Sequence, residues 1–119
     1  MSKHDQLRRL QQVASLMFDS RLAQLKTTAR AMQETKDHLA NLATAPEEST
    51  AMPPIAMTVA ALRYNRWADV RRADLNLTLA RQTADWLNAR EAARAAFGKT
   101  QALEAVKASI SAASARHRS

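Results

Sequence analysis

The chain has 119 residues, of which 46% are hydrophobic but only 4% aromatic, with no cysteine and a net charge of +7 at neutral pH. This length allows one domain at most, and the absence of cysteine excludes disulfides and thiolate metal sites. No stretch is apolar enough for a membrane span and the N-terminal residues lack a signal-peptide core, so we expect a cytoplasmic protein.

The composition favours an all-α fold. Glycine occurs once and proline three times, whereas Ala, Leu, Arg and Gln are abundant. All three prolines lie in residues 44–54, "TAPEESTAMPP", and proline strongly disfavours a helix interior. We therefore predict an antiparallel two-helix coiled-coil hairpin: helix one over 5–43, a Pro-rich loop over 44–54, helix two over 55–97, and a frayed tail over 98–119.

The first predicted helix carries a single apolar row. Its members recur every three or four residues, the spacing of a coiled-coil seam, with a stutter of consecutive four-residue steps around Phe18. The row comprises Leu7, Leu10, Ala14, Phe18, Leu22, Leu25, Ala29, Met32, Lys36, Leu39 and Ala43.

The second predicted helix carries a matching row, to which we assign the inner seam: Val59, Leu62, Arg66, Val70, Ala73, Leu77, Ala80, Ala84 and Leu87. Folding the chain about residue 49 places Leu39 near Val59, Leu25 near Ala73 and Ala14 near Ala84. The small residues in both rows would allow the helices to approach closely.

A second apolar stripe lies on the opposite side of helix two, because its members cluster within about 60° at 100° per residue. It comprises Tyr64, Leu75, Leu79, Trp86, Ala93 and Phe97. Since a two-helix hairpin buries only one side of each helix, we expect Leu75, Leu79, Trp86 and Phe97 to bind a partner or to mediate self-association into a homodimer. The alternative is that these are scattered exposed apolar residues, which are common on any protein.

The only glycine, Gly98, follows Phe97 in the segment "ARAAFGKTQALEAVKA". Glycine costs about 1 kcal/mol in a helix interior relative to alanine, so we expect a hinge or a fraying point there. Leu103, Val106 and Ile110 still recur at helical spacing. The tail could therefore fold on binding, or it could be a frayed extension without a role, and we expect its last residues, "ASARHRS", to be disordered.

This pattern resembles the flagellar FliJ family, whose relatives include the YscO-type proteins of virulence type III secretion. The family begins with a Leu/Arg-rich segment, as in "LRRLQQVA", and near the end of helix two it carries an aromatic residue, a basic residue, Ala-Leu-Glu and Lys or Arg. Phe97, Lys99, Ala102-Leu103-Glu104 and Lys107 match that order, with Phe97 where Trp is common.

The resemblance implies a non-catalytic stalk or adaptor of the flagellar-type protein export apparatus. Its paired ends would enter the ring of the export ATPase, the hairpin would contact the export gate protein, and export chaperones are further candidate partners. Carried onto this chain, Phe97, Leu103, Glu104 and Lys107 would lie at the ATPase end.

Other function classes have less support. The net charge of +7 is spread along both helices and could guide the chain into an acidic pore or attract nucleic acid. Against nucleic acid, acidic residues alternate with arginines in segments such as "DVRRAD", as on a solvated, salt-bridged helix face. The histidines lack metal-ligand spacing and there is no Gly-rich phosphate loop, so we expect no enzyme activity, metal or cofactor. A secreted hairpin of the WXG class is disfavoured, because neither tryptophan is followed by the required glycine.

Overall fold

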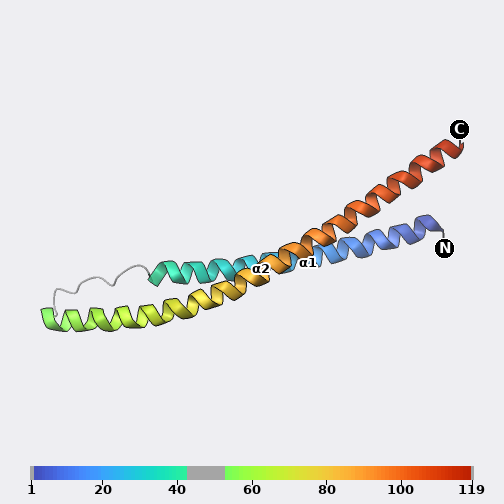
Figure 1. Cartoon of the computed structure of the whole chain (residues 1–119). Coiled ribbons are helices and arrows are strands. Elements are labelled where there is room, and N and C mark those ends of the chain that lie inside the picture. Colours follow the sequence, from blue (N-terminus) through green and yellow to red (C-terminus); the bar gives the residue numbers. More distant parts are fainter. Residues whose placement is uncertain (1, 43–52, 119) are drawn as a thin grey trace. The chain divides into compact units, whose positions relative to one another are not determined.

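A computed structural model of the chain describes residues 2–42 and 53–118, which form two helices (Figure 1). Helix α1 spans Lys3–Leu42 and helix α2 spans Pro54–Arg118. The predicted antiparallel two-helix hairpin is confirmed, and no strand occurs within the two described segments. The predicted loop lies for the most part outside the described residues, including Pro46, as does Ala43 of the predicted seam.

Both helices begin with residues suited to a helix N-terminus. The Ser2 hydroxyl accepts a hydrogen bond from the Asp5 amide at 3.1 Å, and Asp5 also places a negative charge in the first turn of α1. Helix α2 begins at Pro54, where the missing N–H of proline costs no intrahelical bond, and the Met57 amide donates to the Pro53 carbonyl at 3.0 Å. The prolines therefore start the second helix as predicted.

The predicted end of helix two at Phe97 is wrong, because α2 continues without interruption through Gly98 to Arg118. Gly98 has no positive φ, so its backbone stays helical, and good helix formers surround it. Arg116, His117 and Arg118 occupy the last turn, where positive charge interacts favourably with the helix dipole. The segment expected to fray is therefore the C-terminal part of one 65-residue helix.

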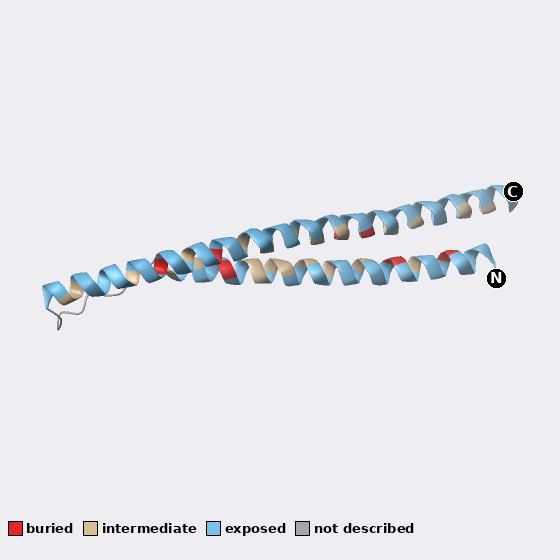
Figure 2. Ribbon diagram, turned by 60° about the horizontal axis from the view of Figure 1, so that its bottom comes forward, coloured by how far each residue is buried: buried red, intermediate tan, exposed pale blue. Residues whose placement is uncertain are grey.

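The chain divides into two units, which are described separately. Unit 1 consists of residues 1–28 and 86–119, and unit 2 consists of residues 29–85. In unit 1 the start of α1 pairs with the C-terminal half of α2. In unit 2 the end of α1 lies beside the N-terminal half of α2 (Figures 1 and 2).

The pairing register of unit 1 is set by two contacts. The rings of Phe18 and Phe97 lie 5.5 Å apart, and the Gln11 side-chain amide donates to a Glu104 carboxylate oxygen at 3.2 Å. Moving back along α1 from 18 to 11 corresponds to moving forward along α2 from 97 to 104, so the helices are antiparallel. Both pairs are centred between residues 57 and 58, not at residue 49.

This register corrects the predicted pairing of Ala14 with Ala84. Ala14 instead lines a groove together with Ala96 and Lys99 of α2. The start of α1 therefore faces the segment that was expected to fray, which gives the helix beyond Gly98 a packing partner.

In unit 1, the residues that α2 contributes to the seam are small. Leu7 and Ala14 of α1 and Ala93 and Ala96 of α2 are buried, while Phe18 and Leu22 are half-buried. Figure 2 shows buried positions, in red, on both helices. Apolar burial of this kind contributes about 25 cal/mol per Å² removed from water. Most of the row predicted on α1 is therefore confirmed, but Leu10 is 56% exposed.

In unit 2 the buried residues are Thr35, Ala68 and Leu75. Thr35 occupies the inner position that was assigned to Lys36, which is exposed, and its hydroxyl donates to the Ala31 carbonyl at 3.2 Å. The α1 portion of this unit, 29–42, is less than half as long as the α2 portion, 54–85, so it covers only part of α2. Neither α1 nor α2 is long and apolar enough to cross a membrane.

Candidate partner-binding surface

The two apolar faces of α2 are exchanged relative to the sequence prediction. The stripe expected to face outward lies on the inner side: Leu75 is 7% exposed, and Leu79 and Trp86 are half-buried. The row expected to form the seam is exposed instead, with Leu62 64% exposed. The other exposed members of that row include Val59, Val70, Leu77 and Leu87.

The expected outward position of Leu75 is therefore corrected, because its side chain is buried, whereas partner binding by the half-buried Leu79 and Trp86 stays a prediction. Leu75 therefore offers little apolar area to another protein, while Leu79 and Trp86 are partly shielded and partly exposed. One face of the Trp86 ring also lies under the guanidinium of Arg90, whose carbon is 5.6 Å from the ring centroid, within the range of a cation–π interaction.

Phe97 behaves differently, since it contacts α1 and remains accessible. Its ring meets Phe18 at an interplanar angle of 51°, a tilted arrangement that aromatic pairs favour, and the residue is 48% exposed. Phe97 can therefore serve the pairing of the helices and still present an aromatic edge to a partner.

The remaining predicted site residues lie beside Phe97 on the same continuous helix. Leu103 is half-buried and lines a groove between the helices, Glu104 accepts the hydrogen bond from Gln11, and Lys107 is exposed. In unit 1, Phe97 meets Phe18, Leu103 lines a groove with Leu10, and Glu104 bonds Gln11 of α1. Lys107 is an exposed residue one helical turn beyond Leu103 on α2.

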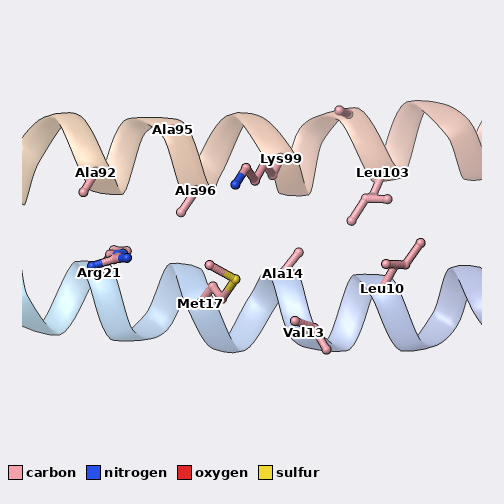
Figure 3. Close-up of a pocket in the computed structure, with 11 residues that line it drawn as sticks. Leu10, Val13, Ala14, Met17, Arg21, Ala92, Ala95, Ala96, Lys99 and Leu103 are labelled. Atoms are coloured by element: carbon pink, nitrogen blue, oxygen red, sulfur yellow. The ribbon is translucent and has the colours of Figure 1, made fainter.

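Sequence reasoning missed the groove in which Leu103 lies (Figure 3). It has a volume of about 500 Å³ and runs along one side of unit 1. Its lining from α1 is Leu10, Val13, Ala14, Met17 and Arg21, and its lining from α2 is Ala92, Ala95, Ala96, Lys99, Ala102 and Leu103. The detectable signal was the i, i+3, i+7 spacing of Leu10, Val13 and Met17, beside the seam, opposite an alanine-rich segment.

The positive charge of the chain is also divided unequally between the units. Unit 1 contains eleven of the 18 Lys and Arg residues but only four of the 11 Asp and Glu residues, whereas unit 2 contains seven of each. The net charge of +7 therefore belongs to unit 1, although it is spread over both helices. In unit 2 the balance is visible in the exposed ion pair of Arg72 with Asp69 at 2.9 Å.

Within residues 2–42 and 53–118, no group of three or more His, Asp or Glu side chains is placed to hold a metal ion. No family model, curated protein or solved structure matches the chain. The site must therefore be interpreted from its own geometry: an apolar groove and an exposed aromatic residue on a positively charged pair of helices.

Proposed function

We propose that this protein is a non-catalytic coiled-coil stalk or adaptor of a flagellar-type protein export apparatus, acting in the cytoplasm through contacts with the export ATPase ring and the export gate protein. The observation that carries the proposal is the joint placement of the residues on which the FliJ resemblance rests. Phe97, Leu103, Glu104 and Lys107 follow one another on uninterrupted helix, and Leu103 and Glu104 lie against Leu10 and Gln11 of the Leu/Arg-rich start of α1.

The charge of unit 1 supports the same function. A narrow, strongly positive pair of helices is attracted to an acidic opening, and such long-range attraction raises the association rate before any close contact forms. The exposed apolar row of unit 2, which includes Leu62 and Leu77, supplies a separate surface for the gate protein or for an export chaperone.

Self-association into a homodimer is less favoured, because the apolar stripe that suggested it lies on the inner side of α2, where Leu75 is buried. One observation favours nucleic-acid binding: the positive charge of the chain is concentrated in unit 1. Nucleic-acid binding and protein binding can be distinguished by experiment. The affinity for nucleic acid falls steeply with salt concentration and should not change when Phe97 is replaced, whereas the affinity for a protein depends on both charge and apolar contacts.

The test is co-purification of the full chain with the export ATPase of the same organism, followed by measurement of ATP hydrolysis. We expect the chain to bind the ATPase and to raise its rate of hydrolysis. Lys107→Glu should weaken binding by about tenfold, because it reverses an exposed charge at the proposed contact. The matched control is Lys36→Glu, an exposed lysine in unit 2, which should bind as the unchanged protein does.

Circular dichroism must show equal helicity for both variants. A folded chain that neither co-purifies with the ATPase nor changes its rate would refute the proposal. Equal losses for the two lysine variants would show that binding responds to net charge alone and not to the end of the hairpin that carries the motif.

A further inference from the structure

The apolar groove of unit 1 has the chemistry of a docking site. Leu10, Val13 and Met17 are 56%, 54% and 43% exposed, so three large apolar side chains of α1 remain largely in water along its length. The opposite wall is mostly alanine, and the small side chains of α2 leave the space open (Figure 3). Covering these side chains would remove apolar surface from water without displacing any residue of the seam.

The two sides of unit 1 differ in character. On the other side, the hollow between the helices is lined by Arg8, Gln11, Gln12, Ser15, Leu16 and Glu104, so only one of its six residues is apolar. The same helix pair therefore presents one polar side, typical of a surface in water, and one side suited to a further packed element.

We propose that the groove binds the apolar face of an amphipathic helix that belongs to another protein and carries acidic residues beside that face. The lining runs from residue 10 to 21 on α1 and from 92 to 103 on α2, which at 1.5 Å per residue is about 17 Å, or three helical turns. A third helix placed between two others buries side chains at i, i+3, i+4 and i+7, the common mode of helix-in-groove recognition.

The charges in the groove specify an acidic occupant. Arg21 and Lys99 are its only charged lining residues. Because Phe97 is level with Phe18, Lys99 lies about five residues of helix rise from Arg21, or about 7.5 Å. Two carboxylates spaced by one to one and a half turns on the occupant could pair with both cations.

The same charges disfavour a second copy of this chain as the occupant. Two copies joined through this groove would bring together the two units that carry a net charge of +7 each, and like charges at an interface cost association free energy. The inference concerns the apolar side of unit 1 and does not depend on the export function, since any partner with an acidic amphipathic helix satisfies it.

The experiment uses the full chain and a fluorescent synthetic peptide of about 18 residues, long enough to be helical in isolation. The peptide carries leucines at i, i+3, i+7 and i+10 with glutamates flanking them, and a second peptide has lysine in place of every glutamate. Binding is followed by fluorescence anisotropy. We expect saturable binding of the acidic peptide and at least about tenfold weaker binding of the basic one.

Variants of the chain locate the binding site. Leu10→Asp should weaken binding of the acidic peptide by about tenfold or more, whereas Leu16→Asp, on the polar side of the same helix and 69% exposed, should change it less than about twofold. Ala95→Gln is a second test and should also weaken binding of the acidic peptide. It fills the groove with a bulkier, neutral and helix-favouring side chain at an exposed position.

Several results would overturn the inference: no binding of the acidic peptide, equal binding of the two peptides, or equal effects of Leu10→Asp and Leu16→Asp. A dimer in light scattering that Leu10→Asp dissociates would assign the groove to a second copy. A duplex oligonucleotide that displaces the peptide and binds the Leu10→Asp variant equally well would assign the positive charge to nucleic acid. Failure of ATPase binding alone would refute the export proposal and leave this inference intact.

Discussion

Trp86 shows how one side chain can support opposite interpretations. Its helical spacing with Leu79 and Ala93 is equally compatible with a stripe that faces a partner and with a seam that faces α1. In the structure Trp86 is half-buried and Arg90 lies over its ring. Trp67, the other tryptophan, is 56% exposed and contacts Tyr64 at 5.9 Å between ring centroids. The two tryptophans therefore form a natural comparison.

We expect Trp86→Ala to destabilise the hairpin by roughly 1–3 kcal/mol, less than for a fully buried tryptophan because part of the ring already meets water. Trp67→Ala should cost less than about 1 kcal/mol, as is usual for an exposed side chain. Urea unfolding followed by circular dichroism measures both values. Equal and small effects would mean that Trp86 adds nothing to the seam and would restore the outward-facing interpretation of its stripe.

The inner residues of α1 could be predicted from the sequence and those of α2 could not. On α1, Leu7, Ala14 and Phe18 belong to one long apolar row, so periodicity identifies most of the seam, although Leu10 is exposed and Thr35 takes the place of Lys36. On α2 there are two such rows, one with Leu62 and Leu77 and one with Leu75 and Trp86. Both rows have helical periodicity, so the sequence does not show which of them faces α1; the packing of the two helices does.

At the scale of the helices, the continuity of α2 through Gly98 is the main departure from expectation. A glycine in a helix interior is unfavourable, but its cost of about 1 kcal/mol is small beside the packing of the residues on either side. The Phe18–Phe97 contact and the Gln11–Glu104 hydrogen bond lie on opposite sides of position 98 along α2. Helix propensity accounts for the local cost of glycine at position 98, but it contains no information on these contacts with α1.

Replacement of this glycine by alanine should therefore stabilise the protein. Apart from the adjoining residues and the backbone of its own helical turn, a Cβ atom at position 98 would have no atom within 4 Å, and the residue lies within α2 without a positive φ, so nothing opposes the substitution. We expect Gly98→Ala to raise the free energy of unfolding by about 0.5–1 kcal/mol.

The matched control is Ala105→Gly, at an exposed position on the same helix, which should lower the free energy of unfolding by a similar amount. Both are measured by thermal unfolding. A lower stability of Gly98→Ala would show that position 98 needs the conformational freedom of glycine, and the hinge expected from the sequence would then be correct.

The pairing register illustrates a second limit of sequence reasoning. Placing the centre of the hairpin at residue 49 assumes that the proline-rich segment is the midpoint of two equal arms. The arms are unequal, because α2 has 65 residues and α1 has 40. With its alanine-rich surface, α2 offers several registers of similar apolar match, and the sequence contains no unique pair of large residues that selects one before Phe18 and Phe97 are seen together.

At the scale of the whole molecule, charge separates the two units more clearly than secondary structure does. Both consist of paired antiparallel helices, yet one carries the whole net charge and the other is balanced. This partition follows from the sequence once the unit boundaries are known. The unequal distribution of charge is not apparent along the sequence, because the two segments of unit 1 come from opposite ends of the chain.

Removal of two positive charges should therefore have different effects in the two units. Arg8→Gln with Arg9→Gln acts in unit 1, and Arg71→Gln with Arg81→Gln acts in unit 2, and all four side chains are exposed. Each double variant lowers the net charge equally. We expect the first to elute from a cation exchanger at clearly lower salt than the second, because the adsorbing surface is the region of concentrated charge. Identical elution would mean that the resin responds only to total charge.

The unequal charge also gives the molecule a preferred orientation. On an acidic surface we expect unit 1 to make the first contact, because it carries the net positive charge, while Leu62 and Leu77 of the neutral unit are exposed. We therefore expect charge to select the first contact, at unit 1, and apolar fit to select any contact made by unit 2.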